Sequence, residues 1–274
     1  MSAAGRPGAV VSGALQSGEP WPGAQYVYGV TTSGAAVPSG LQGTGHPAGP
    51  VTLLRHRAIA AIISGVRADQ RMGTLADARA HANVLAVMAD GLSVLPMRFG
   101  AVMPDRDAIV AELLRPHHDT FAVSLARLDG HTQFTIKGKY LGDIALREVL
   151  ATEPEAMRLR ERLRGRDIDA CPRESIRLGE LVVRAMERKR MADLQTLVDA
   201  VTPYAAAIAP FAPSAADSAV DAAFLVRRPQ RSGFEQAAEE LGRRWRSRIR
   251  LRLLGPLPPY DFARTFPEAD EPWA

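Results

Sequence analysis

The order of strand and helix patterns is the feature that most limits the fold of this chain. QYVYGVTT (residues 25–32) has strand composition, and the apolar runs of VTLLRHRAIAAIISGV favour two further strands over one helix because they are rich in Val and Ile. A helix pattern follows from Thr74 to Gly91, and a short strand pattern at 92–100. Strands that follow one another directly are typical of an α+β unit rather than of parallel β-α-β crossovers.

The helix between Thr74 and Gly91 begins at a natural N-cap and ends at a glycine. Pro96 interrupts the apolar run after it, so that strand is predicted at a sheet edge or a bulge. Helical spacing predicts the following buried face for the helix: Leu75, Ala78, Ala82, Leu85 and Met88.

Residues 33–50 are dominated by Gly, Pro and Ser, which predicts a flexible loop. LQGTGHPAG within it superficially suggests a phosphate-binding loop. However, no helix start with Lys and Ser or Thr follows, so the sequence favours a disordered connector.

The second half of the chain predicts another α+β domain. HTQFTIKGKYL alternates as a strand, and AAFLVRR, SGFEQAAEELGRRW and IRLRLLG predict a closing β-α-β that resembles part of a split βαβ unit. Between them, residues 143–209 predict two helices broken at 165–172 and a third helix at 193–209.

These patterns predict the following organisation: a disordered leader at 1–24, an N-terminal α+β domain at 25–115, a C-terminal α+β domain at 116–264 with a helical insertion at 143–209, and a flexible tail at 265–274. The leader lacks the features of a secretory signal, and no apolar run approaches the roughly 20 residues that a membrane helix needs. A cytoplasmic protein that does not bind membranes is therefore expected.

No motif for catalysis, a cofactor or a metal stands out. GxxxxGK[ST], GxSxG and HExxH are absent, and the lone Cys171 excludes an internal disulfide. His117 and His118 are adjacent, so on a helix they point about 100° apart and cannot serve one ion. We expect neither an enzyme nor a bound cofactor or metal.

The chain is basic, with a formal net charge of +4 and a pI of about 9.6. Arg248, Arg250 and Arg252 alternate with apolar residues, as in a half-buried strand with one basic face. We favour the interpretation that this face is solvated or contacts another protein and binds no nucleic acid. The alternative is that the protein is a nucleic-acid-binding regulator that uses an Arg-rich sheet face.

RLLGPLPPYDFA (252–263) places three prolines and a glycine before two aromatic residues, so this segment is predicted to be neither helix nor the middle of a sheet. It is predicted to act as a buckle that folds Tyr260 and Phe262 back onto a domain. The alternative is a binding loop. Tyr26, Tyr28 and Phe99 raise the same choice, because such rings fill cores or form exposed patches for a protein partner.

Three stretches, taken together, resemble one known family: YVYGV (26–30), VLPMRFGAVMPD (94–105) and LLGPLPPYDF (253–262). Their order and spacing are similar to those of the F/L family of gas vesicle proteins. The resemblance covers nearly everything from Tyr26 to Phe262. It marks the following residues as candidates for partner binding or for a structural role: Tyr26, Tyr28, Pro96, Arg98, Phe99, Tyr260 and Phe262.

The resemblance implies two α+β domains of modified ferredoxin-like character, the second with a helical, coiled-coil-like excursion. It also implies an accessory or minor structural protein of gas vesicle assembly in the cytoplasm of buoyant cells. Its expected partners are the major shell protein, which it would bind as an adaptor or chaperone, and other gas vesicle accessory proteins.

Overall fold

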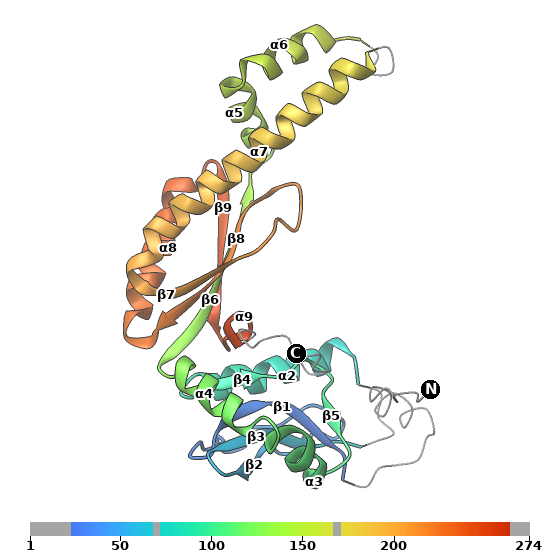
Figure 1. The fold of residues 1–274 in the computed structure, drawn as a ribbon, viewed down its shortest axis with the longest axis vertical. Coiled ribbons are helices and arrows are strands. Elements are labelled where there is room, and N and C mark those ends of the chain that lie inside the picture. Colours follow the sequence, from blue (N-terminus) through green and yellow to red (C-terminus); the bar gives the residue numbers. More distant parts are fainter. Residues whose placement is uncertain (1–22, 68–71, 167–170, 264–274) are drawn as a thin grey trace, which may run out of the picture. The chain divides into compact units, whose positions relative to one another are not determined.

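The computed structural model describes residues 23–67, 72–166 and 171–263. They form two compact units (Figure 1). Unit 1 combines the residues up to Thr132 with those from Pro256 onward, and unit 2 is Gln133–Gly255. Each unit combines helices with a sheet, which confirms the predicted α+β class.

In unit 1, the strands follow the order β2-β3-β1-β4, and β5 also pairs with β1; all of these pairs are antiparallel. β4 ends this order, in agreement with the edge position that Pro96 predicts. The elements of unit 1 are β1 (Gln25–Thr32), β2 (Thr52–His56), β3 (Ile59–Gly65), α2 (Leu75–Ala89), β4 (Val94–Pro96), β5 (Val102–Met103), α3 (Arg106–Ala108), the π-helical η1 (Ile109–Leu114), α4 (His118–Leu128) and α9 (Tyr260–Ala263).

Strand β1 is the centre of unit 1. It is buried without interruption from Tyr26 to Thr31. Because alternate side chains point to opposite faces, this burial requires cover on both faces of the sheet. α2 packs on β1 and β4, and α4 contacts β1, β3 and β4. The cluster under α2 consists of Tyr26, Tyr28, Val51, Ile62, Val84, Leu85, Met88 and Val94.

Helix α2 has the predicted start, because Thr74 and Asp77 form a reciprocal capping box. Its predicted buried face is partly wrong, since Leu75 is 68% exposed and Ala82 is also exposed. The buried positions are Asp77, His81, Val84, Leu85 and Met88. Two of them are polar, so apolar periodicity alone assigns the face incorrectly.

The Gly-rich loop before β2 is not the flexible connector that its composition predicts. Leu41 accepts the Val51 N–H in a backbone hydrogen bond of 3.0 Å, and Thr44 is 1% exposed. A Cβ at Gly43 would overlap both the Tyr28 hydroxyl and the Ser64 side chain. This glycine is needed because the loop lies directly on the core.

In unit 2, the strand order is β7-β8-β6-β9. The helix α7 therefore connects β6 to β7 across β8, and α8 connects β8 to β9 across β6, which gives two interleaved β-α-β connections. The elements of unit 2 are β6 (His131–Tyr140), α5 (Ile144–Thr152), α6 (Pro154–Leu163), α7 (Pro172–Val201), η3 (Thr202–Tyr204), β7 (Ala205–Pro210), β8 (Ser218–Arg227), η4 (Arg228–Gln230), α8 (Arg231–Trp245) and β9 (Ile249–Leu257), of which β6 and β9 continue into unit 1.

The C-terminal part of α7 and the helix α8 cover the sheet of unit 2. Leu197 and Val201 of α7 join Phe234 and Trp245 of α8 in one core with the strands. The N-terminal part of α7 packs instead against α5 and α6 and extends with them past the sheet (Figure 1). We call α5, α6 and α7 the helical insertion.

Charged pairs tie the helical insertion together. Glu148 of α5 pairs with Lys189 of α7 and with Arg248, whose guanidinium also contacts Asp193. Glu155 of α6 accepts two hydrogen bonds from Arg177, of 2.9 and 3.3 Å.

Two predictions for the helical insertion are wrong. First, α7 is one continuous helix of 30 residues that includes the predicted start of a third helix at residue 193. Second, the Ala-rich segment Ala205–Pro210 is not helix but strand β7, paired with β8. α7 ends at Val201, and the short 3-10 helix η3 with Pro203 follows it; beyond η3, sheet pairing outweighs the helix propensity of alanine.

The predicted domain boundaries also need correction. Helix α4 packs on the sheet of unit 1, so the boundary at 115/116 falls too early. Residues 256–263 belong to unit 1 and not to the C-terminal domain. Ala24 is buried rather than part of a leader. Gly23 is exposed, and residues 1–22 of the predicted leader and the predicted tail lie outside the described residues.

We predict that Gly43→Ala destabilises the protein by about 1–3 kcal/mol, the usual cost of overpacking a core. The new methyl group would displace Tyr28 or Ser64. Urea unfolding measures the change. Gly34→Ala, in the same loop with nothing within 4 Å of its Cβ, is the matched control. Equal stability of the two variants would contradict the packing of this loop.

Candidate partner-binding site

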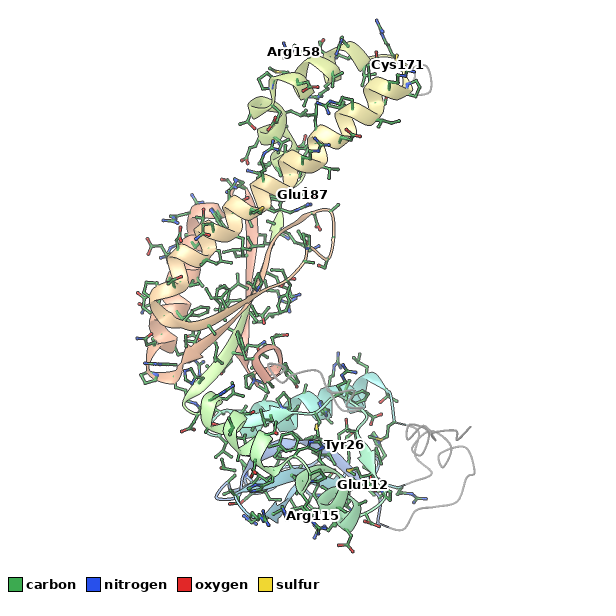
Figure 2. The ribbon with its side chains drawn as sticks, in the orientation of Figure 1. Tyr26, Glu112, Arg115, Arg158, Cys171 and Glu187 are labelled. Carbon is green, nitrogen blue, oxygen red and sulfur yellow. The ribbon has the colours of Figure 1, made fainter. Side chains whose placement is uncertain are left out.

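Four of the predicted candidate residues lie in one aromatic cluster of unit 1. Tyr26 and Tyr28 are fully buried, and their ring centroids are 4.8 Å apart. Phe99 lies 6.4 Å from the Tyr26 ring and is 40% exposed. Tyr260 packs against the same core from the other end of the chain. Figure 2 shows Tyr26 among the side chains of this unit.

A bulge in β1 positions the exposed part of this cluster. The register with β3 shifts between Val27 and Gly29, so Tyr28 is the extra residue. On the other side of β1, the pairing partner changes here from β5 to β4. The loop from Met97 to Ala101 spans this change of partner.

Hydrogen bonds fix this loop to β1 at three points. The Met97 N–H donates to the Tyr28 carbonyl (2.8 Å), the Gly100 N–H donates to the Tyr26 hydroxyl (2.8 Å), and the Ala101 carbonyl accepts from the Val27 N–H (2.9 Å). Arg98 and Phe99 form the exposed tip of this loop. An aromatic ring and a guanidinium are thus presented on a backbone that is already ordered.

His81 of α2 completes the support beneath Phe99. Its Nδ1 lies 3.0 Å from the Tyr26 hydroxyl, and its ring meets the Phe99 ring edge-on at 5.7 Å. Because the Tyr26 oxygen accepts the Gly100 N–H, its own proton is available to His81 Nδ1. Burial lowers the His81 pKa to about 4, although a hydrogen bond to the Met97 backbone opposes this shift. His81 is therefore neutral at pH 7.

A second polar network connects the Gly-rich loop to α2. The Thr44 N–H donates to the Tyr28 hydroxyl (2.6 Å), which also lies 2.8 Å from Ser64 Oγ. The Thr44 hydroxyl donates to Asp77 (3.2 Å). Burial acts to raise the Asp77 pKa, but hydrogen bonds from Thr74, Gly73 and Thr44 outweigh it and lower the pKa overall.

The proline-rich segment brings Tyr260 back onto unit 1, the arrangement that the buckle hypothesis expects. Pro258 and Pro259 are buried. Tyr260 begins the short helix α9, which contacts β4, so the prediction that this segment contains no helix is wrong: the prolines precede the helix, where their missing N–H groups cost nothing. Its ring packs on the cluster that contains Tyr26 and Tyr28. Burial raises the Tyr260 pKa to about 12. The segment thereby attaches the end of the described chain to unit 1.

Two other candidates, Pro96 and Phe262, are less closely associated with the aromatic cluster. Pro96 pairs with Gly29 at the end of β4, and Phe262 is half-buried in α9. No sequence motif marks the polar residues that support the cluster: His81, Asp77, Thr44 and Ser64. The spacing of Asp77 and His81 with Val84 and Met88 is the signal that could have found the first two.

Within the described ranges, no His, Cys, Asp and Glu side chains gather in threes to hold a metal ion. The Cys171 thiol is free and partly exposed. None of the described helices combines the length and the apolar character needed to span a bilayer.

Two solved structures share this fold. The crystal structure of the gas vesicle protein GvpF from Anabaena sp. PCC7120 matches 89% of this chain and all of its own, with a TM-score of 0.78 and 21% identity. GvpF from Microcystis aeruginosa matches the same share of this chain with a TM-score of 0.74 and 23% identity. These likenesses establish the fold.

Sequence comparison identifies the family. The model of the gas vesicle synthesis protein GvpL/GvpF family matches residues 24–264. Gas vesicle protein F of Streptomyces sp. (strain CB03234) is 33% identical over 86% of this chain and 98% of its own, and gas vesicle protein L of that strain is 28% identical over 87% and 92%. The chain belongs to the GvpL/GvpF family, which confirms the resemblance and a role in gas vesicles.

We predict that Tyr260→Ala destabilises unit 1 by about 2 kcal/mol, less than the loss of a fully buried ring, because Tyr260 is half-buried. Thermal or urea unfolding followed by Tyr fluorescence measures this. Tyr260→Phe keeps the ring and should retain most of the stability. A binding loop without a structural role would instead leave the unfolding midpoint of Tyr260→Ala unchanged.

We predict that stability falls as the pH is lowered from about 6.5 toward about 4, by up to about 3 kcal/mol, because the unfolded chain protonates His81 first. Urea unfolding between about pH 7 and about pH 4.5 tests this, above the range in which Asp77 titrates. His81→Gln should flatten the slope. An equally steep slope in that variant would assign the effect to other groups.

Proposed function

We propose that this protein is an adaptor or chaperone of gas vesicle assembly that binds the major shell protein through unit 1. The contact is made by the tip of the Met97–Ala101 loop, with Phe99 as the apolar anchor and Arg98 beside it. Other gas vesicle accessory proteins are the further partners that we propose.

One observation carries this proposal: a large aromatic ring is exposed on a loop that is held rigidly from below. Phe99 is 40% exposed, yet the Tyr26 and His81 rings support it and three hydrogen bonds fix its backbone. Exposed aromatic and Arg side chains are typical anchors of protein interfaces. Because the loop is already ordered, binding loses little conformational entropy.

The chemistry of the proposed partner fits such an anchor. A shell subunit that must present an apolar face to gas exposes apolar surface and strand edges before it assembles, and these promote uncontrolled self-association. A protein that covers part of this surface keeps the subunit competent for assembly. This role needs no catalysis and no cofactor, and we place it in the cytoplasm at the growing vesicle.

We also propose that both units derive from a modified ferredoxin-like pattern. The strand orders are β2-β3-β1-β4 in unit 1 and β7-β8-β6-β9 in unit 2. When these four strands are numbered along the chain within each unit, both sheets have the spatial order second, third, first, fourth. Unit 2 has two interleaved β-α-β connections, with α5 and α6 inserted before α7. In unit 1, the ordered loop before β2 takes the place of the first connecting helix.

Phe99→Ala in the full chain tests the shell-binding proposal by co-purification with the major shell protein after co-expression. We expect at least about a tenfold loss of retained shell protein, since aromatic anchors contribute 2 kcal/mol or more. Phe211→Ala is the matched control, because Phe211 is 38% exposed but lies in unit 2. Loss of retention in the control alone would move the binding surface to unit 2.

A further inference from the structure

The helical insertion contains an apolar groove that the proposed shell contact does not use. Its cavity volume is about 980 Å³. The apolar part of its lining comes from all three helices: Leu146 and Leu150 of α5, Leu163 of α6, and Leu178 and Val182 of α7. Leu146 is 40% exposed, so the groove opens to solvent.

Gly179 lines this groove from the interior of α7. Glycine there costs about 1 kcal/mol relative to alanine. A Cβ at this position would meet nothing within 4 Å, so no contact inside the described chain explains the glycine. The absence of a side chain keeps this part of the groove open to the close approach of another polypeptide.

The rim of the groove is positively charged. Arg160, Arg164 and Arg166 line it together with one acidic residue, Glu161. Glu161 lies 3.5 Å from Arg164, and both side chains are largely exposed. A ligand that combines apolar side chains with carboxylates would complement both the apolar lining and the rim.

Residues 264–274 of this chain have that composition. The sequence RTFPEADEPWA holds two large aromatic residues, Phe266 and Trp273, with Glu268, Asp270 and Glu271 between them. We propose that this segment of a second copy docks in the groove, with its aromatic rings on the apolar lining and its carboxylates on the arginine rim.

Reach favours a second copy over the same chain. Gln133 and Gly255 lie next to each other at one end of the sheet of unit 2. At the other end, the Leu141 N–H donates to the Arg248 carbonyl, and Arg248 pairs with Glu148 of the helical insertion. The path from the Gln133 end of the sheet to the groove has two parts. The eight residues of β6 between the two ends rise about 26 Å, and α7 from Lys189 to Gly179 adds about 15 Å.

Residues 256–263 belong to unit 1. Residues 264–274 span at most about 40 Å when fully extended. This is no more than the path along unit 2 from Gly255 to the groove, so docking in its own chain would leave no residues to fill the groove. Docking in a second copy has no such limit, and it joins different surfaces head to tail.

Charge exchange between two full-length variants tests this by sedimentation velocity. One variant carries Arg160→Glu and Arg164→Glu, and the other carries Glu268→Arg and Glu271→Arg. We expect the unmodified chain to self-associate, each variant alone to associate at least about tenfold more weakly, and an equimolar mixture to recover association, because opposite charges meet again only between different chains. Arg158→Glu, on α6 but outside the groove lining, is the control that should associate normally.

Gly179→Leu gives a second measurement that a misfolded variant cannot imitate. Leucine favours the helix and fills open space, so the thermal midpoint should stay equal or rise while self-association is lost. The proposal is overturned if the unmodified chain remains monomeric at its highest soluble concentration. It is equally overturned if the charge variants associate normally, if their mixture fails to recover association, or if Gly179→Leu associates like the unmodified chain.

Discussion

The satisfaction of two buried tyrosine hydroxyls determines much of unit 1. Tyr26 and Tyr28 lie on the central strand with no exposed surface, and a hydroxyl buried without a partner costs roughly 1–3 kcal/mol. Each hydroxyl finds its backbone partner in a different loop, Gly100 for Tyr26 and Thr44 for Tyr28. The order of the Gly-rich loop and the presentation of Phe99 therefore depend on the same strand.

The sequence predicts the parts of this arrangement that depend on local pattern. The strands, the edge position of Pro96 and the capping of α2 by Thr74 follow from alternation, proline chemistry and capping. The buried face of α2 does not, because Asp77 and His81 occupy positions where apolar residues are expected. Their burial becomes understandable only with partners from distant segments, Thr44 for Asp77 and Tyr26 for His81.

The candidate site and the unit boundaries also depend on contacts between distant segments, which local sequence patterns do not predict. Composition cannot distinguish a flexible Gly-rich loop from one in which Gly43 must lie against a tyrosine hydroxyl. It predicts that Tyr260 folds back, but not onto which unit, since that choice joins residues more than 200 positions apart. Contacts of this kind have no local signature, so local patterns predict that Tyr260 belongs to the C-terminal domain.

The arginine content of unit 2 has a structural explanation that bears on the nucleic-acid alternative. Arg248, the first of the three alternating arginines, pairs with Asp193 and Glu148, and Arg190 donates to two backbone carbonyls. Arg250 and Arg252 remain exposed. Two cations on one strand fall well short of the roughly 6–10 phosphate contacts that give proteins strong, salt-dependent affinity for nucleic acid. Arg190 and Arg248 thus help to hold the long helix α7 to the sheet, so part of the basic composition of this unit serves its own packing.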